Sequence, residues 1–260
     1  MDGSSDGAAG PRLAGLTAVV TGGNRGIGLA VAEGMAKAGA DVAVWARDGA
    51  TSADAVERLR GHGVRALAVA CDVADEQQVA EAMTRTVDEL GPLGCFVANA
   101  GISAAAPFVD TPLEDWRRVL RTNLDGAFLT TREAARRFVA QGSGGSIVVV
   151  ASTVSRFGAA NQAAYAASKT GLLGLGRTLA VELARHRVRC NMLLPGWTRT
   201  DMTAPALRNE RFTAATTART PVRRWAEPAE FEEVAAFLAD PALTFHTGNE
   251  VVVDGGYTVF

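Results

Sequence analysis

The sequence predicts an α/β fold with one doubly wound parallel sheet of about seven strands and helices on both faces. Two observations support this prediction. Short β-rich runs alternate with amphipathic segments along the whole chain, a pattern typical of right-handed strand–helix–strand crossovers. Most of the strand-like runs are continuously apolar rather than alternating, as expected for strands that are covered by helices on both faces.

The expected strands are spread over the whole length of the chain. They are Thr17–Val20, Val42–Ala46, Val64–Ala70, Cys95–Ala98, Ile147–Ala151, Val188–Leu194 and Glu250–Val253. Helical patterns lie between them, at about 27–38, 50–61, 75–90, 112–140, 162–185 and 228–239. The stretch 195–227 has no regular pattern, and a connection of that length is usually a functional lid or binding loop. We therefore expect one domain over 13–260, with a substrate loop at about 195–227.

Composition argues against several classes of partner. Of the 260 residues, 48% are hydrophobic and 21% are charged, and the formal net charge is −2. We therefore expect neither a nucleic-acid partner nor a membrane partner. Residues 1–12 are rich in Gly, Ser, Ala and Asp and predict a short disordered tail without a targeting signal.

Three further sets of residues have simple structural interpretations. Three widely spaced cysteines in apolar segments predict buried thiols in a reducing compartment and hence a cytoplasmic protein: Cys71, Cys95 and Cys190. The three histidines have no ligand spacing, so no metal site is expected. Two groups of arginines are interpreted as solvated surface: Arg117, Arg118 and Arg121, and Arg185, Arg187 and Arg189.

A glycine-rich turn follows the first strand and leads directly into a helix. Its residues are Thr21, Gly22, Gly23, Asn24, Arg25, Gly26, Ile27 and Gly28. Glycines let the backbone approach a pyrophosphate closely, and the following helix N-terminus offers it unpaired N–H groups. Glycine turns alone are common, but this position between the first strand and a helix strongly indicates a dinucleotide site.

The end of the second strand indicates which dinucleotide is bound. An acidic residue here would bind the ribose 2′-hydroxyl of NAD, whereas an arginine accommodates the 2′-phosphate of NADP. The strand ends at Ala46 and is followed by Arg47, and Arg25 lies in the glycine turn. Asp48 is an alternative ribose ligand, but its position is typical of an N-cap. Both arginines are alternatively ordinary surface residues, yet the pattern favours NADP(H) over NAD(H).

Tyr165 and Lys169 are the most informative pair in the chain. Four residues apart on the expected helix 162–185, they project from the same face. Taken alone, Tyr165 would be interpreted as a core aromatic residue. A lysine on an apolar helix face is costly unless it has a partner or a function. Only Lys37 and Lys169 among the 26 basic residues are lysines, so background composition does not explain Lys169.

This pair suits proton transfer to and from a carbonyl oxygen. Tyrosine, with a pKa of about 10, is a poor base near neutral pH. A neighbouring ammonium group favours the phenolate and lowers that pKa. Ser152 directly follows the fifth strand and is expected to donate a hydrogen bond to the same oxygen. Thr153 and Ser155 are nearby alternatives that fall later in the chain.

Together these motifs resemble the short-chain dehydrogenase/reductase family, in particular its 3-oxoacyl-carrier-protein reductase-like and ketoreductase-like members. The resemblance extends from about Leu13 to Tyr257. Its residues are Thr21 to Gly28, Asn99-Ala100-Gly101, Asn123, Ser152, Tyr165-x-x-x-Lys169, and Pro195-Gly196 followed by Thr200. It implies a Rossmann-type fold, a dinucleotide-binding catalytic domain and a homotetramer paired through helices 112–140 and 162–185.

The resemblance also implies roles for individual residues. The catalytic set would be Asn123, Ser152, Tyr165 and Lys169, with Asn123 anchoring a water of the proton relay. Further cofactor contacts would come from Asp72, Val73, Asn99, Ala100, Gly101, Pro195, Gly196, Thr198 and Thr200. Two positions depart from the family pattern, since Thr198 replaces a branched aliphatic residue and Ala98 replaces an asparagine.

The sequence says least about the substrate. The expected pocket is fairly apolar and contains Ser152, Val154, Gln162, Tyr165, Trp197 and Met202. We expect interconversion of a small or medium ketone and a secondary alcohol. Reduction of 3-oxoacyl groups on a carrier protein is the alternative reaction. A non-catalytic NADP-binding sensor or scaffold is the alternative class, although an intact Asn–Ser–Tyr–Lys set argues against it.

Overall fold

The computed structural model describes residues 12–260, and all strands of this part of the chain form one parallel sheet. The strands are β1 (Thr17–Thr21), β2 (Asp41–Ala46), β3 (Ala66–Ala70), β4 (Leu93–Ala98), β5 (Gly145–Val150), β6 (Val188–Pro195) and β7 (Glu250–Val253). Their order is β3-β2-β1-β4-β5-β6-β7. The predicted doubly wound parallel sheet is confirmed. Of the expected disordered tail 1–12, only Arg12 lies within the described residues.

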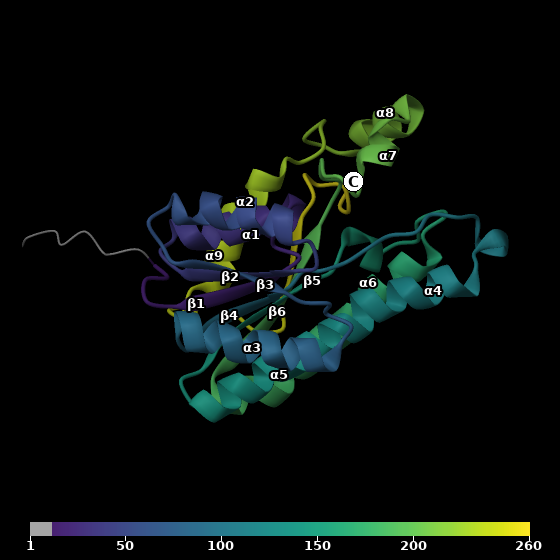
Figure 1. The fold of residues 1–260 in the computed structure, drawn as a ribbon. Helices are drawn as coiled ribbons and strands as arrows, with labels where there is room; N and C mark the ends of the chain where they lie inside the picture. The colour runs from purple at the N-terminus through teal and green to yellow at the C-terminus, as the bar shows by residue number, and fades with distance from the viewer. Residues whose placement is uncertain (1–11) are drawn as a thin grey trace, which may run out of the picture.

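Helices cover both faces of the sheet (Figure 1). One layer contains α1 (Gly26–Lys37), α2 (Gly49–Arg60) and α9 (Glu232–Ala239). The other contains α3 (Glu76–Leu90), α4 (Leu113–Leu120), α5 (Gly126–Gln141) and α6 (Ala163–Leu183). Neighbouring strand residues such as Val19 and Val20 belong to the two separate apolar clusters on opposite sides of the sheet. This arrangement explains why the strand sequences are continuously apolar.

The expected helix 112–140 is interrupted. A π-helical turn, η2 (Arg121–Asp125), separates α4 from α5, and the Gly126 N–H donates to the Arg121 carbonyl. Asn123 lies inside this turn and is completely buried. π-turns of this kind are frequent at functional sites. The prediction of one uniform helix was therefore wrong at the position that carries Asn123.

The stretch 195–227 is more ordered than predicted. It contains two short helices, α7 (Ala204–Leu207) and α8 (Glu210–Arg219). Asn209 caps α8, since its side chain accepts a hydrogen bond from the Phe212 N–H at 3.1 Å. Figure 1 shows these two helices standing apart from the sheet, across from the projecting end of α4. The substrate loop was therefore wrongly predicted to be irregular throughout.

Arg189 is another correction, because it is buried rather than solvated. It lies in β6 with 7% of its surface exposed. Its guanidinium donates to the carbonyls of Leu238 at 3.1 Å and Asp240 at 2.9 Å. The cation is tolerated there because main-chain oxygens solvate it. Its position within strand β6, rather than at a helix end, is what distinguishes it from Arg185 and Arg187.

Candidate active site

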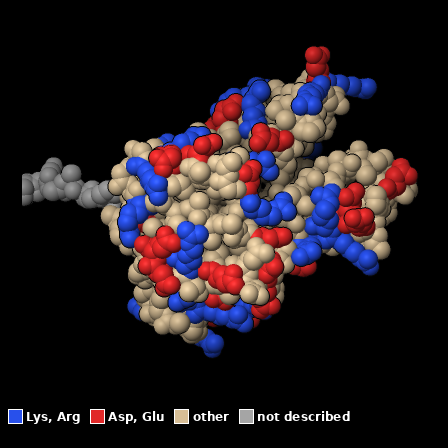
Figure 2. Space-filling view, in the orientation of Figure 1, with Lys and Arg blue, Asp and Glu red and all other residues tan. Residues whose placement is uncertain are grey.

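A cleft of about 610 Å³ runs along the carboxyl ends of the strands. Figure 2 shows the molecule hollowed on this side, between the lobe of α7 and α8 and the arm of α4, with basic and acidic groups interspersed over the surface. All of the residues predicted to bind the cofactor line the cleft, as do Ser152 and Met202 from the predicted substrate pocket. In open α/β sheets this edge is the usual ligand site.

The glycine turn forms one wall of the cleft, and the shape of its backbone requires glycine at positions 22, 26 and 28. Gly22 and Gly26 have φ values of 62° and 55°, which L-residues with a side chain rarely adopt. A Cβ on Gly28 would lie 2.2 Å from the Gly22 carbonyl oxygen and 2.4 Å from the Asn99 amide nitrogen. The first turn of α1 has no side-chain cap at Arg25, so its N–H groups are available to a ligand.

Threonine and asparagine side chains fix the floor of the cleft. The Thr21 hydroxyl accepts hydrogen bonds from the N–H groups of Asn99 and Ala100, at 2.9 and 3.0 Å. The Asn99 amide donates back to the Thr21 carbonyl at 2.9 Å. These bonds join the ends of β1 and β4, so the glycine turn and the Asn99-Ala100-Gly101 segment are held as one unit.

The end of β2 presents Arg47 and Asp48 to the cleft. Asp48 is confirmed as the N-cap of α2, because its carboxylate accepts from the N–H groups of Ala50 and Thr51 at 3.0 and 3.3 Å. Arg47 is exposed. Arg25 lies 3.8 Å from the Asp201 carboxylate, and both of these side chains are largely exposed. An exposed pair at this distance contributes little energy, so Arg25 remains available to an anionic ligand.

Ser152, Tyr165 and Lys169 meet in the same cleft. The Lys169 amine donates to the Val150 carbonyl at 2.8 Å and lies 5.7 Å from the centre of the Tyr165 ring. Burial lowers the pKa of Lys169 to about 8. The pKa of Tyr165 is raised, not lowered as expected from the neighbouring ammonium group, because burial outweighs the opposing effect of the Ser152 side chain. Tyr165 is therefore a phenol at neutral pH, with a proton to donate.

Asn123 holds the wall between β4 and α6. Its Oδ1 accepts from the Ile102 N–H at 2.8 Å, and its Nδ2 donates to the Ile102 carbonyl at 2.9 Å and to the Ser168 hydroxyl at 3.1 Å. Both amide hydrogens are used by these bonds. The water contact implied by the family resemblance is therefore left to Oδ1 or to the main chain.

Three residues of the predicted substrate pocket lie outside the cleft lining, namely Val154, Gln162 and Trp197. The Gln162 side chain instead accepts from the Ser103 hydroxyl at 2.8 Å. Trp197 stacks on Trp225, with ring centres 5.0 Å apart. Their assignment as substrate contacts stays a prediction.

Several residues that line the cleft were not predicted as site residues, and the sequence carried a usable signal for only some of them. Ile102 and Ser103 lie just beyond the end of β4, where position alone was a usable signal. Arg118 and Thr122 line the cleft from α4 and η2. Their spacing of four residues places them on one helix face, but a polar helix face carries no signal of its own.

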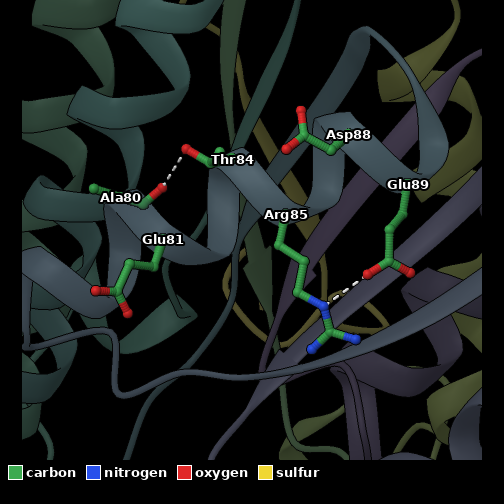
Figure 3. Close-up of a pocket in the computed structure, with 6 residues that line it drawn as sticks. All are labelled: Ala80, Glu81, Thr84, Arg85, Asp88 and Glu89. Atoms are coloured by element: carbon green, nitrogen blue, oxygen red, sulfur yellow. Dashed lines mark hydrogen bonds and ion pairs between the residues drawn. The ribbon is translucent and has the colours of Figure 1, made fainter.

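A separate hollow on the outer face of α3 is a poor candidate site (Figure 3). All six residues that line it are exposed and belong to α3: Ala80, Glu81, Thr84, Arg85, Asp88 and Glu89. Arg85 and Glu89 form an ion pair at 2.7 Å along the helix, and no second element contributes a converging group. This is the solvated face of one helix.

Residues 12–260 contain neither a membrane-spanning helix nor a cluster of metal ligands. No helix in that range is long and apolar enough to cross a bilayer. The same part of the chain contains no cluster of His, Cys, Asp and Glu that could hold a metal ion.

Relatives of the chain match along nearly its whole length. A family model described as Enoyl-(Acyl carrier protein) reductase matches residues 22–258. The cis-4-hydroxycyclohexanecarboxylate dehydrogenase of Sinomonas cyclohexanicum is 43% identical over 251 residues, covering 96% of this chain and 99% of the relative.

Solved structures match over a similar share of the chain. A short-chain type dehydrogenase/reductase from Mycobacterium marinum has a TM-score of 0.90 and 37% identity, covering 95% of this chain and 96% of that one. A gluconate 5-dehydrogenase from Burkholderia cenocepacia J2315, in complex with NADP and tartrate, has a TM-score of 0.91 and 34% identity, with 96% and 97% covered.

Proposed function

The chain belongs to the short-chain dehydrogenase/reductase family, and from that premise we propose that it is an NADP(H)-dependent oxidoreductase interconverting a ketone and a secondary alcohol. One observation carries the proposal. The Lys169 amine is buried beside Tyr165, and its only hydrogen-bond partner within residues 12–260 is the Val150 carbonyl. Holding an ammonium group there without a carboxylate is costly, and a role in proton transfer and ribose binding explains it.

Tyr165 acts as the general acid in reduction and as the general base in oxidation. The Ser152 hydroxyl holds the substrate oxygen next to the phenol, so the proton travels a short distance along a fixed direction. Lys169 stabilises the phenolate that remains. A bound nicotinamide would supply or accept the hydride. No catalytic metal is required by these roles, because the proton donor neutralises the developing alkoxide.

The residues of the cleft fit a dinucleotide. The space that a Cβ would fill at Gly22 and Gly28 is closed by backbone and by Asn99, so only glycine lets the turn hold this shape. The uncapped N–H groups of α1 suit a pyrophosphate. Asp72 and Val73 would hold the adenine, and Lys169 would bind the nicotinamide ribose.

Arg47 and Arg25 support NADP(H) over NAD(H). One oxygen of Asp48, the acid next to the end of β2, accepts from two N–H groups of α2, which favours a capping role over ribose binding. Two relatives with bound NADP, the gluconate 5-dehydrogenase named above and one other solved neighbour, are consistent with this choice.

Replacing Arg47 with Ala is expected to weaken NADPH binding by about 10–100-fold. Each charge-assisted hydrogen bond contributes roughly 1.5–3 kcal/mol, and about 1.4 kcal/mol corresponds to tenfold. NADH has no 2′-phosphate and serves as the internal control. Ala46→Asp is expected to have a larger effect, because it repels the phosphate and offers NAD a ribose acceptor.

The measurement is the ratio of kcat/KM for NADPH to that for NADH in wild type and both variants. A wild-type ratio below one, or a ratio that neither substitution changes, would show that these arginines are ordinary surface residues.

The substrate is proposed to be a small or medium ketone. Met202 of the substrate loop 195–227 lines the cleft, and Phe212 packs edge-on against Trp197 in the same loop, with ring centres 5.1 Å apart, so this loop carries apolar surface. The relative from Sinomonas cyclohexanicum acts on a hydroxylated cyclohexane carboxylate, which makes cyclic keto acids the first compounds to try.

A panel of ketones with NADPH tests the proposed activity, with loss of NADPH absorbance as the readout. The panel contains cyclohexanones with and without a carboxylate, linear ketones, a keto sugar acid and a 3-oxoacyl thioester. Turnover of a free ketone supports the proposal. Turnover of the thioester alone favours the carrier-protein alternative, and tight NADPH binding without any turnover favours a sensor.

The homotetramer also stays a prediction, and a stable monomer by sedimentation at micromolar concentration would contradict it.

A further inference from the structure

The orientation of Ser152 depends on the short helix that it begins. The Ser152 hydroxyl oxygen accepts a hydrogen bond from the Val154 N–H at 3.2 Å, inside the 3₁₀-helix η3 (Thr153–Ser155). The Ser152 carbonyl accepts from the Ser155 N–H at 3.0 Å. Ser152 and Tyr165 line the same cleft, so a displacement of η3 would change the position of the Ser152 hydroxyl relative to the phenol.

The far end of η3 is tied to the edge strand. Arg156 follows η3 directly, and its Nη2 and Nε donate to one carboxylate oxygen of Glu250 at 2.8 and 3.2 Å. The other oxygen of Glu250 accepts from Arg177 of α6 at 2.5 Å. Glu250 therefore joins three elements, namely the segment after β5, helix α6 and strand β7.

This cluster differs from an ordinary surface ion pair, which contributes little. The Glu250 side chain is only 17% exposed, and both of its oxygens are used. Burial alone would raise the pKa of Glu250, but the hydrogen bonds from Arg156 and Arg177 outweigh it and hold the pKa below its usual range. The carboxylate is therefore ionised at neutral pH, where it can bind both arginines.

We propose that Arg156, anchored by Glu250, is a positioning residue that holds Ser152 in place for proton transfer through η3. The start of η3 has its own support, since the Thr153 hydroxyl donates to the Pro195 carbonyl at 3.3 Å. Arg156 supplies the matching support at the other end, where its N–H also closes the turn on the Thr153 carbonyl at 2.9 Å. This inference rests on the proposed function, because it assigns Ser152 its catalytic role.

The two arginines on Glu250 offer a matched pair of variants. Arg156→Met removes the link from Glu250 to η3. Arg177→Met removes the other bond to the same carboxylate but leaves η3 anchored. If the cluster only stabilised the fold, the two substitutions would have equal effects on kcat. The positioning role predicts that kcat falls about 10–100-fold in Arg156→Met, the loss typical of a small misplacement of a reacting group. The KM for NADPH should stay the same, and Arg177→Met should keep kcat within about twofold. Arg156→Lys should recover most of the activity.

A second measurement needs no turnover, so it separates this inference from the proposed function. Tyr165 and Tyr257 are the only tyrosines, so carbon-13 labelling of the tyrosine Cζ atoms gives two NMR resonances, which Tyr257→Phe assigns. Displacement of the Ser152 hydroxyl should shift the Tyr165 resonance in Arg156→Met and leave it in place in Arg177→Met. Equal shifts in both variants, or no shift in either, would overturn the inference. A wild type that turns over no ketone would instead overturn the proposed function alone.

Discussion

Tyr165→Phe is expected to lower kcat about 10²–10⁴-fold while leaving the affinity for NADPH close to that of wild type. That range is typical for loss of a general acid. Burial raises the pKa of Tyr165 despite the opposing hydrogen bond with Ser152, so wild type carries the transferable proton at neutral pH. Phe keeps the ring beside the Lys169 amine and removes only the hydroxyl. Steady-state kinetics and a fluorescence titration with NADPH measure the two effects separately.

The other tyrosine provides the matched control. Tyr257 is buried and packs against Phe157, with ring centres 5.7 Å apart, but it does not line the cleft. Tyr257→Phe loses a hydroxyl of the same kind and is expected to keep near-normal turnover. If Tyr165→Phe retained as much activity as this control, the assignment of the general acid would be wrong.

Lys169→Met is expected to abolish turnover and at the same time to stabilise the ligand-free protein by about 1–3 kcal/mol at pH 7. Burial lowers the pKa of Lys169 from 10.5 to about 8 in the folded chain. Between those two pH values the unfolded chain binds more protons than the folded chain, so wild-type stability rises with pH there. Below pH 8 the Lys169 amine is charged in the folded chain as well, so the full cost of burying that charge destabilises wild type. A neutral methionine does not carry this cost. The gain should therefore disappear as the pH rises toward 10.5.

Thermal unfolding of the two proteins at pH 7 and at pH 10 measures this effect. Lys37→Met is the control, because Lys37 is the only other lysine and is half-exposed in an ion pair with Glu232. Its replacement should leave turnover intact and give no stabilisation. A Lys169→Met variant that is less stable than wild type at pH 7 would show that the buried amine is well solvated in the folded protein.

The elements that the sequence predicted best are those whose signals are local. The seven strands and the glycine turn follow from apolar runs and from spacing, and the structure moves their ends by only a few residues. Asp48 was identified as a cap because an N-cap needs only the chain next to it. Each of these features is determined by residues that are close together in the sequence.

The features that the sequence did not predict depend on distant contacts. The π-turn at Asn123 accompanies hydrogen bonds between its side chain and Ile102 and Ser168, neither of which is near it in sequence. Arg189 is buried because carbonyls from the end of α9 and beyond surround it. The helix α8 was missed although Asn209 is a good cap, because α8 buries only Thr216 and so has no clear apolar face.

The central claim is that this cleft transfers a hydride between NADPH and a ketone, with the proton coming from Tyr165. The most direct test incubates wild type and Tyr165→Phe with NADPH carrying deuterium at the transferable C4 position and with the best ketone of the panel. Mass spectrometry then measures the alcohol. The claim predicts one deuterium on the carbinol carbon for each NADPH oxidised by wild type, and almost no product from Tyr165→Phe. Unlabelled alcohol, or labelled alcohol formed equally fast by both proteins, would contradict it.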